Sequence, residues 1–371
     1  MSGPGERPIL LTGATGFVGM ELLARYLERS ARPVITLIRA RDDAQAQERL
    51  DEVLVNMLGD NALRYRGRVT ALAGELTAPH LGLGARRWAQ LASELGMIVH
   101  SAASVSFSLP LEEARAINLE GTRRMLELAE RAEALERYAH ISTAYVAGTH
   151  EGRFGERDLD LGQEFRNSYE QSKFEAEQLV RSAGVPFTIL RPSIVVGERR
   201  SGWTAAFNVL YWPLRALSRG LFTAVPAIPS APVDVVPVDY VADAIQSLCE
   251  REDGIGATFH LTAGRDASTI LEIANAAARY FKRPLPEVMS PADFATRACP
   301  ARERSAMAAG TAYFPYFAVS TVFDNTATRA LLEPAGILAA PLGDYLERLL
   351  DFATRSRWGK NPIGRAEALA F

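Results

Sequence analysis

Cysteine is scarce in this chain of 371 residues, which contains only Cys249 and Cys299. The two thiols lie far apart and lack the spacing of metal ligands, so we expect a reducing, cytoplasmic setting, structural thiols and no metal site. Long hydrophobic runs are also missing, because no apolar stretch reaches the roughly 18 residues that cross a bilayer. Residues 1–8 lack the apolar core of a signal peptide. The sequence therefore predicts no transmembrane segment.

An excess of charge of one sign is missing too. The formal net charge is -3 and the pI is near 6.1, which gives no electrostatic reason to expect nucleic acid as a partner. Apolar residues make up 48% and charged residues 23%, as is ordinary for a soluble globular enzyme. A chain of this length exceeds the size at which one core stops growing. We therefore expect a main domain with a second lobe; the sequence defines no oligomeric state.

Apolar runs typical of buried strands alternate with helical patterns through the first half of the chain. Strands are predicted near residues 9–11, 34–38, 69–72, 97–100, 138–142 and 187–190. Helices are predicted near residues 17–29, 44–57, 85–95, 119–134 and 168–182. This order predicts an α/β fold with a Rossmann-type, doubly wound parallel sheet and helices on both faces.

The amino-acid composition changes after the sixth predicted strand. The segment 202–232 is rich in Trp, Phe, Leu and Pro, and four apolar residues in it follow helical spacing: Phe207, Leu210, Leu214 and Leu217. Pro213 is expected to kink or divide that helix. These residues either pack in a core or form an apolar wall or lid over a substrate channel.

A smaller C-terminal lobe is indicated by a further strand near residues 258–261 and helices near 268–281 and 340–355. We expect the Rossmann-type domain to cover residues 1–200, with residues 233–250 returning to it. Residues 201–371 would then form mainly the substrate-binding lobe.

Residues 12–19 read TGATGFVG and carry the most information in the chain. They join an apolar strand to a helical pattern, as in a dinucleotide-binding βαβ unit. Gly13 permits a tight turn with positive φ, Gly16 lets backbone approach a pyrophosphate, and Gly19 lets the helix pack on the strand. The N–H groups that open the helix receive phosphates. The predicted contacts are Gly13, Thr15, Gly16, Phe17, Val18 and Gly19.

Cofactor choice is predicted by the end of the second strand, which reads LIRAR. NAD-type sites place an acid there for the ribose 2′-hydroxyl, but no acid occurs before Asp42. Arg39 and Arg41 form either a solvated strand end or a clamp for a 2′-phosphate. We favour the clamp because the fold places this position beside the ribose. The sequence thus predicts NADPH and, with it, reduction.

Tyr169 and Lys173 lie four residues apart in the stretch YEQSK. This spacing puts both side chains on one helical face, one turn apart. Free tyrosine has a pKa of about 10 and is a poor acid–base group at neutral pH. We expect the Lys173 ammonium and the nicotinamide ring to lower the pKa of Tyr169. Lys173 would also hold the nicotinamide ribose.

Further candidates follow the fourth and fifth predicted strands, whose carboxyl ends face the crevice of an open sheet. Thr143 is expected to donate a hydrogen bond to a substrate carbonyl oxygen, and Ser142 to satisfy neighbouring backbone. Ala102 and Ala103 are small enough to let a cofactor lie over the fourth strand end.

His100 and Asn118 have less specific expectations. A histidine at a strand end is more often packed and hydrogen-bonded than catalytic, so His100 is expected to be structural. Asn118 precedes the helix predicted near residue 119 and either caps it or bridges backbone near the active site.

Together these stretches resemble the extended short-chain dehydrogenase/reductase superfamily: TGATGFVG, HSAA, STAYV, YEQSK, RPSIVVGE and PVDYVADAI. Others are similar to one branch, the fatty acyl-CoA reductases and carboxylic-acid thioester reductase domains: LIRAR, GELTAPHLGL, SAASVSFSLP, INLEGT, the Gly-Trp pair at 202–203 and VFDNTATRALL. The resemblance covers residues 9 to about 360, with its specific motifs mostly in residues 9–245.

The resemblance implies a catalytic set of Thr143, Tyr169 and Lys173. It implies NADPH contacts from the turn glycines, Arg39 and Arg41, and we expect others from Ala102, Ala103, Pro192, Ser193 and Ile194. The expected substrate contacts are Ser104, Asn118, Trp203 and Phe207. Glu75-Leu76 departs from the aspartate that usually contacts adenine; the longer Glu75 either reaches the same amino group or turns outward.

The resemblance leads us to expect NADPH-dependent reduction of an acyl thioester to an aldehyde, with the alcohol as a further product. Since the glycine turn begins at residue 12, we expect a stand-alone enzyme that receives its thioester from coenzyme A or a separate acyl carrier protein. The first alternative is an extended reductase acting on an aldehyde, ketone or hydroxysteroid. A sugar-nucleotide epimerase or dehydratase and a non-catalytic dinucleotide sensor are less favoured.

Overall fold

A parallel sheet forms the centre of the molecule. The computed structural model of the protein describes residues 7–298 and 300–370, and in this part of the chain seven strands share one sheet. They are β1 (Ile9–Thr12), β2 (Val34–Ile38), β3 (Val69–Ala73), β4 (Met97–His100), β5 (Arg137–Ile141), β7 (Phe187–Pro192) and β12 (Thr258–Leu261). Each strand expected from the sequence is present, with ends displaced by at most two residues.

The strand order β12-β7-β5-β4-β1-β2-β3 is that of a Rossmann-type fold with one added strand. Every pairing in this sheet is parallel, and the expected fold class is confirmed. The order reverses at β1, whose Thr12 pairs with Leu37 of β2 on one side and His100 of β4 on the other. In such sheets ligands bind at this switch point, beyond the carboxyl ends of the strands.

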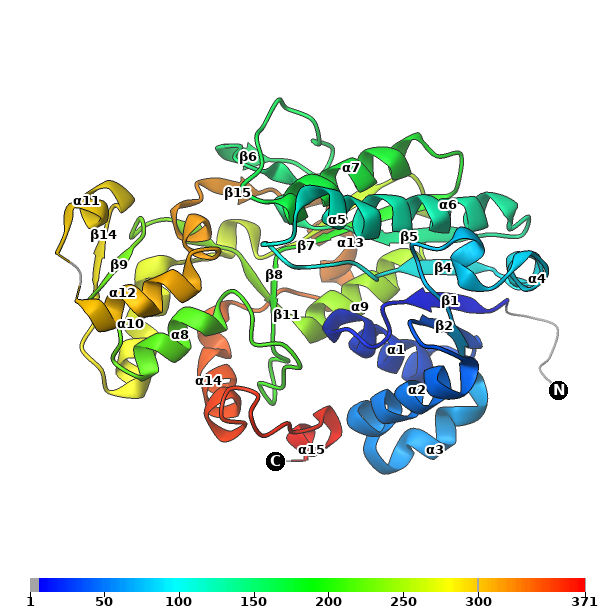
Figure 1. Ribbon diagram of the computed structural model, residues 1–371, viewed down its shortest axis with the longest axis horizontal. Helices are drawn as coiled ribbons and strands as arrows, with labels where there is room; N and C mark the ends of the chain where they lie inside the picture. The colour runs from blue at the N-terminus through cyan, green and yellow to red at the C-terminus, as the bar shows by residue number, and fades with distance from the viewer. Residues whose placement is uncertain (1–6, 299, 371) are drawn as a thin grey trace.

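Helices cover both faces of the sheet (Figure 1). One layer contains α1 (Phe17–Arg29), α2 (Asp43–Leu58), α3 (Ala62–Tyr65) and α9 (Val238–Cys249); the other contains α4 (Ala85–Glu94), α5 (Leu111–Arg115), α6 (Gly121–Arg131) and α7 (Ser168–Ser182). The Nε atom of Arg25 in α1 lies 2.6 Å from Oδ1 of Asp243 in α9, so an ion pair joins the chain's first helix to a late one. No helix within the described residues is long and apolar enough to cross a membrane.

The helix predicted over residues 119–134 begins earlier than expected. It runs from α5 through a π-helical turn, Ala116–Glu120, into α6. Asn118 therefore lies inside a continuous helical segment, and its predicted role as a helix cap was wrong. A π-helical turn often occurs at functional sites, because the extra residue redirects the side chains around it.

The second lobe lies on the left in Figure 1 and has its own apolar core. Its helices are α8 (Tyr211–Ser218), α10 (Ile270–Phe281), α11 (Pro291–Thr296), α12 (Ala301–Gly310) and α14 (Leu346–Arg355). Leu210, Leu214 and Leu217 are buried in that core, which confirms the packing interpretation for them. Pro213 stands in the first turn of α8, where a missing N–H is tolerated, so it does not divide the helix.

Short strands complete the connections between the two parts. They pair as β6 (Gly152–Phe154) with β15 (Thr321–Phe323), β8 (Ile194–Val196) with β11 (Val235–Pro237), β9 (Ala224–Pro226) with β14 (Glu287–Met289) and β10 (Pro232–Val233) with β13 (Ser268–Thr269). The pairing of β8 with β11 continues directly from β7, so the route into the second lobe starts at the carboxyl edge of the main sheet.

The end of the chain returns to the first domain. Helix α13 (Thr326–Leu332) contacts α9 and β12, and α15 (Arg365–Leu369) lies against α2. The Nε atom of Arg365 lies 2.7 Å from Oε2 of Glu21 in α1. Leu332, Phe352 and Ala368 accordingly belong to the apolar core beneath the sheet, although all three follow residue 201.

Of the two cysteines, Cys249 is a buried free thiol at the end of α9. Burial raises its pKa to about 12, so it stays protonated and packs as a small apolar residue. Cys299 lies outside the described residues.

Gly19 supplies a test of the fold. Alanine is the better helix former by about 1 kcal/mol, so local propensity alone would favour Gly19→Ala. A Cβ at this position would lie 1.9 Å from the carbonyl oxygen of Gly13, however, and the turn would have to open. We expect Gly19→Ala to lower the thermal unfolding midpoint by roughly 2–8 °C and to abolish dinucleotide binding, measured by calorimetry and fluorescence titration.

The matched control is Gly184→Ala. A Cβ there would meet no atom of the described chain within 4 Å, so both quantities should stay at the wild-type value. Wild-type dinucleotide affinity in Gly19→Ala would contradict the role given to the turn.

Candidate active site at the strand ends

The glycine turn is closed too tightly for any other residue. Gly13 has φ of 76°, and a Cβ on it would lie 2.8 Å from the backbone nitrogen of Ala102. The N–H of Gly16 donates to the carbonyl of Gly13 at 2.8 Å, and Gly16 caps α1 with no side chain of its own. The opening N–H groups of α1 therefore face the carboxyl edge of the sheet, where a pyrophosphate fits.

Hydrogen bonds of Thr12 and His100 stabilise the backbone next to this turn. Thr12 Oγ1 accepts from the N–H of Ala102 at 3.1 Å and lies 2.8 Å from His100 Nδ1. The other ring nitrogen of His100 lies 3.3 Å from Oγ1 of Thr122 in α6. Burial and the nearby Lys173 lower the pKa of His100 to about 3, so it is neutral. His100 is thus the packed, hydrogen-bonded histidine that we expected.

Arg39 and Arg41 are both exposed just beyond β2. The Arg41 Nε donates to Oδ2 of Asp42 at 3.2 Å, and Asp42 in turn caps α2 by accepting from the N–H of Gln45 at 2.8 Å. No acid stands at the strand end itself, and Arg39 is exposed there. The preference for NADPH stays a prediction.

The Glu75 side chain is turned toward its own loop. Its Oε1 accepts from the N–H of Thr77 at 3.4 Å, so this geometry favours the second of the two alternatives. Leu76 lies against the start of α6, where its Cβ is 3.5 Å from the position that a Cβ of Gly121 would occupy. Leu76 is half-buried and packs against the apolar core on that side of the sheet, and its contact with adenine stays a prediction.

Tyr169 and Thr143 lie together at the carboxyl edge. Asn167 caps α7 by accepting from the N–H of Glu170 at 3.0 Å, which puts Tyr169 in the first turn of the helix. Thr143 directly follows the end of β5 and caps a short 3₁₀ turn. Desolvation raises the pKa of Tyr169 to about 12, and a hydrogen bond with Thr143 partly opposes it. At neutral pH Tyr169 is therefore a protonated hydrogen-bond donor.

Lys173 corrects one prediction. We expected its ammonium to lower the pKa of Tyr169, but Lys173 Nζ donates to the carbonyl of Ile141 at 2.8 Å and lies 3.4 Å from His140 Nε2. A buried lysine must satisfy its donors, and the strand carbonyl is within reach. Burial lowers the pKa of Lys173 itself from 10.5 to about 8.

Asn118 bridges backbone near the active site, the second of its two expected roles. Its Oδ1 accepts from the N–H of Ser104 at 2.8 Å and its Nδ2 donates to the Ser104 carbonyl at 3.1 Å. Nδ2 also donates to Ser172 Oγ at 2.9 Å. Asn118 thus ties the loop after β4, which contains Ala103 and Ser104, to the catalytic helix.

The buried carboxylate of Glu177 connects α7 to the strands β5 and β7. Ser142 Oγ donates to Oε2 of Glu177 at 2.7 Å, so Ser142 binds a side chain and not the backbone that we expected. Arg191 of β7 donates to the same carboxylate at 2.6 and 3.0 Å.

The strand end at Pro192 borders Thr143, one of the predicted catalytic residues. Its carbonyl accepts from Thr143 Oγ1 at 3.5 Å. Ser193 and Ile194 follow, and both are buried along the line that connects β7 to β8. All three residues lie at the carboxyl edge of the sheet next to Thr143, and their contact with the cofactor stays a prediction.

Trp203 and Phe207 do not lie where we expected a substrate pocket. Trp203 is only 1% exposed, its ring centroid is 5.6 Å from that of Phe17, and its Nε1 donates to the carbonyl of Ile363. Trp203 therefore packs against the first residue of α1, which follows the glycine turn. Phe207 packs against Phe352 and Trp358 and contacts both the core of the first domain and that of the second lobe.

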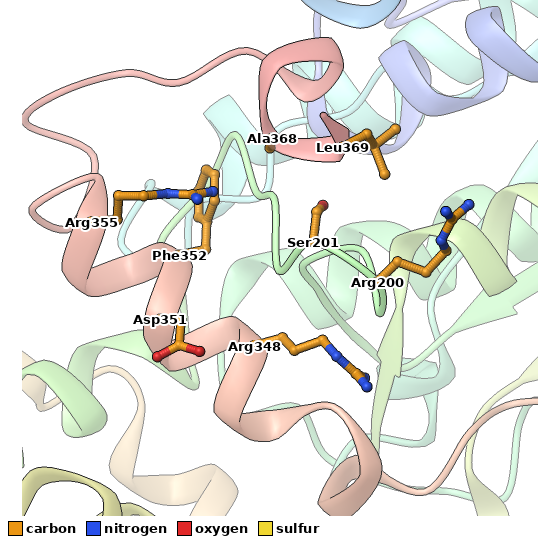
Figure 2. Close-up of a pocket in the computed structure, with 8 residues that line it drawn as sticks. All are labelled: Arg200, Ser201, Arg348, Asp351, Phe352, Arg355, Ala368 and Leu369. Carbon is orange, nitrogen blue, oxygen red and sulfur yellow. The ribbon is translucent and has the colours of Figure 1, made fainter. Parts of the chain in front are cut away.

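An open pocket of about 390 Å³ has none of the predicted catalytic residues in its lining; Figure 2 shows the residues that line it. It lies between α14, α15 and the loop after β8, and its lining residues are Arg200, Ser201, Arg348, Asp351, Phe352, Arg355, Ala368 and Leu369. The Arg348 guanidinium donates to the carbonyls of Arg199 and Asp344, so it serves to join α14 to that loop. None of the predicted site residues lines this pocket.

Sequence reasoning missed the aromatic rings around Tyr169. The ring centroid of Phe107 lies 5.7 Å from that of Tyr169 and 5.2 Å from that of Tyr316. Phe107 lies in the stretch SAASVSFSLP, which the resemblance already singles out and which could have indicated this residue. Tyr313 and Tyr316 arrive from a segment more than 140 residues further along the chain, which no local pattern connects to Tyr169.

The sheet, the glycine turn and the Tyr169–Lys173 pair define a short-chain dehydrogenase/reductase of the extended type. Residues 11–245 match the NAD-binding family model described as Male sterility protein, and the chain belongs to this family.

Relatives come from two kinds of protein. The chain is 30% identical over 272 residues to fatty acyl-CoA reductase 1 of Mus musculus, which covers 63% of this chain and 53% of the mouse protein. It is 35% identical over 251 residues to isonitrile lipopeptide synthase of Streptomyces coeruleorubidus, which covers 65% of this chain and 16% of that synthase. The chain thus spans only part of the length of these relatives.

Among solved structures, the terminal R domain from the myxalamid PKS-NRPS biosynthetic pathway is similar over nearly the whole chain. The TM-score is 0.82 and the sequence identity 27%, with 98% of this chain and 94% of that one covered. The second lobe is therefore part of the shared architecture.

The pKa of Lys173 can be measured directly, because the chain has only three lysines. Nitrogen-15 NMR of the side-chain amino groups should show one signal that titrates near pH 8 and disappears in Lys173→Arg.

The lowered pKa of Lys173 also makes the stability of the folded protein depend on pH. The contribution of Lys173 to the free energy of unfolding is fully present above the unfolded pKa of 10.5 and is lost as pH falls through about 8, the folded pKa. Wild type should lose stability relative to Lys173→Met over this range. A pH-independent difference would contradict the burial of this amino group.

Proposed function

We propose that this protein reduces an acyl thioester to an aldehyde with NADPH. The observation that carries the proposal is the meeting of the Tyr169 and Thr143 hydroxyls, with Lys173 one helical turn away, at the sheet edge where the glycine turn opens. The thioester is the finer part of the proposal and is supported by the relatives, one of which is named as a fatty acyl-CoA reductase.

The turn residues fit a dinucleotide, because a Cβ at Gly13 or Gly19 would collide with backbone. When bound, the nicotinamide supplies a hydride, with its two electrons, to the thioester carbonyl carbon. Tyr169 and Thr143 donate hydrogen bonds to the oxygen as it becomes negative, and each such donor is typically worth about 3 kcal/mol. Lys173 lies where it can hold the ribose.

The tetrahedral hemithioacetal then collapses. Its carbon–sulfur bond breaks, the carbonyl re-forms, and the thiolate takes up a proton, so one hydride and one proton convert the thioester into an aldehyde and a free thiol. Tyr169 is protonated at neutral pH, which suits a donor to the developing oxyanion. The same residues can serve a second reduction of the aldehyde to the alcohol.

Two thiol carriers are compatible with the proposal, coenzyme A and a separate acyl carrier protein. The mouse relative is named for fatty acyl-CoA, whereas the myxalamid structure is named as the terminal R domain from a PKS-NRPS biosynthetic pathway. The competing function is reduction of an aldehyde or ketone, which uses the same donors and releases no thiol.

Tyr169→Phe tests the chemical step. Removing the phenol hydroxyl should lower kcat by about 10²–10⁴-fold, the usual contribution of a positioned proton donor, and leave NADPH affinity within about twofold. The control is Tyr65→Phe, a partly exposed tyrosine in α3. Wild-type kcat in Tyr169→Phe would remove this residue from the mechanism.

Product analysis separates the two candidate functions. NADPH oxidation and free thiol should be measured together, with acyl-CoAs and with the matching aldehydes. Equal amounts of oxidised cofactor and thiol in the first turnover support thioester reduction. Oxidation with aldehydes and never with thioesters would establish the competing function.

Arg39→Ala tests the cofactor. Loss of a charge-assisted contact to the 2′-phosphate should raise the KM for NADPH by about 10–100-fold and leave the KM for NADH unchanged. The matched control is Arg64→Ala, an exposed arginine in α3. An equal effect on both cofactors, or none on NADPH, would contradict the proposed clamp.

A further inference from the structure

Four partly exposed aromatic side chains follow one another away from the catalytic tyrosine: Tyr169, Phe107, Tyr313 and Trp212. The centroids of successive rings are 5.7, 5.9 and 6.4 Å apart. Phe107 comes from the loop after β4, Tyr313 from the segment after α12, and Trp212 from α8. We call these four residues the aromatic row. It begins at the reacting centre and ends in the second lobe.

The near end of the row is fixed to the catalytic helix. The Tyr316 hydroxyl donates to Oε1 of Glu170 at 2.6 Å and accepts from Asn167 Nδ2 at 2.8 Å. The ring of Tyr316 stacks on Phe107, with centroids 5.2 Å apart. Because Glu170 follows Tyr169 directly, the position of Phe107 is set relative to the catalytic hydroxyl.

The far end is equally well defined. The Trp212 ring packs against Phe222 and Phe314, at centroid distances of 5.6 and 5.7 Å. A Cβ on Gly310, the last residue of α12, would come within 2.2 Å of the Trp212 ring, so the indole lies directly on that helix end. Figure 1 shows α8 and α12 side by side in the second lobe.

Two arms leave a thioester carbonyl: the acyl chain, and a thiol arm that contains amides and phosphates. A phosphate requires cations or several N–H donors, whereas Phe107 and Trp212 are partly exposed side chains that are mostly apolar ring. Apolar chains gain most by covering such surface. The row therefore suits the acyl arm.

We propose that the aromatic row binds the acyl chain of the substrate and that Trp212 determines the preferred chain length. This inference rests on the proposed function and names its substrate class as thioesters of medium or long apolar acids. The aromatic row takes no part in the transfer of hydride or proton, so the proposed reaction is unchanged.

The test compares two thioesters of one carrier, butyryl-CoA and dodecanoyl-CoA, in wild type and Trp212→Ala. The ratio of kcat/KM for the long over the short substrate should fall by about tenfold or more, since only the long chain reaches Trp212. The value for butyryl-CoA should stay within about twofold. Equal losses for both chain lengths would overturn the proposal, because they would mark Trp212 as merely structural.

The matched control is Trp358→Ala. Trp358 is also a partly exposed tryptophan of the second lobe, but it packs against Phe207 and Phe281, away from the row. It should leave the ratio unchanged. Dodecanoyl-pantetheine against dodecanoyl-CoA gives a second control, because Trp212→Ala should not alter the preference between thiol arms. A changed thiol preference with an unchanged chain-length ratio would overturn the assignment to the acyl arm.

A second variant moves the Trp212 ring without removing it. Gly310→Ala forces the Trp212 indole to move, so the chain-length ratio should change by at least about threefold in a protein whose circular dichroism matches wild type. This variant decides the matter if Trp212→Ala fails to fold. An unaltered ratio would show that the indole does not contact the chain.

Binding separates this inference from the proposed function. S-dodecyl- and S-butyl-pantetheine are thioethers that cannot be reduced, and their affinities can be measured by calorimetry without turnover. Tighter binding of the dodecyl compound, lost in Trp212→Ala, supports the row even if no thioester is reduced. Equal affinity of wild type for both thioethers overturns the inference, whereas absence of thioester turnover overturns the function alone.

Discussion

One buried carboxylate, Glu177, connects the elements that carry the predicted catalytic residues. It is fully buried on α7, where Ser142 from the end of β5 and Arg191 from β7 donate to it at 2.7 and 2.6 Å. Burial alone would raise the pKa of Glu177, but the ion pair with Arg191 keeps it below its usual value. Removing one partner of such a buried pair costs about 3–5 kcal/mol. Because Thr143 follows Ser142 and Lys173 lies one helical turn before Glu177, this interaction sets the spacing between the hydroxyl donor and the lysine.

The parts that could be predicted from the sequence are those determined by local constraints. A buried parallel strand must be apolar on both faces, and a glycine turn must be glycine because Cβ atoms at Gly13 and Gly19 would collide with backbone. Both signals lie within a few residues, so the strands and α1 were found almost to the residue. The approach of Tyr169 to Thr143 was also predictable, since parallel strands and the helices after them begin or end at one edge.

What could not be predicted depends on contacts between distant segments. Nothing near Trp203 reveals that its indole packs behind Phe17, or that its N–H donates to the carbonyl of Ile363. The π-helical turn around Asn118 follows from the bridge to Ser104 and Ser172, and no helix pattern records that bridge. The hydrogen-bond partner of the Lys173 ammonium likewise depends on which backbone carbonyl lies near it in the folded protein. Periodicity carries information about one face of one element and none about its neighbour.

The proposed chemistry and the proposed substrate preference involve two adjacent residues of α7. Tyr169 is the proposed donor to the substrate carbonyl, while Glu170 accepts a hydrogen bond from the Tyr316 hydroxyl. Glu170 is fully buried, and burial raises its pKa, so its hydrogen bonds with Tyr316 and Arg166 are needed to keep the carboxylate in place. A change at Tyr316 would therefore disturb α7, whereas two rings, Phe107 and Tyr313, separate Trp212 from Tyr169. If the aromatic row binds the acyl chain as proposed, substitutions at its far end would change the substrate range and leave the geometry around Tyr169 unaltered.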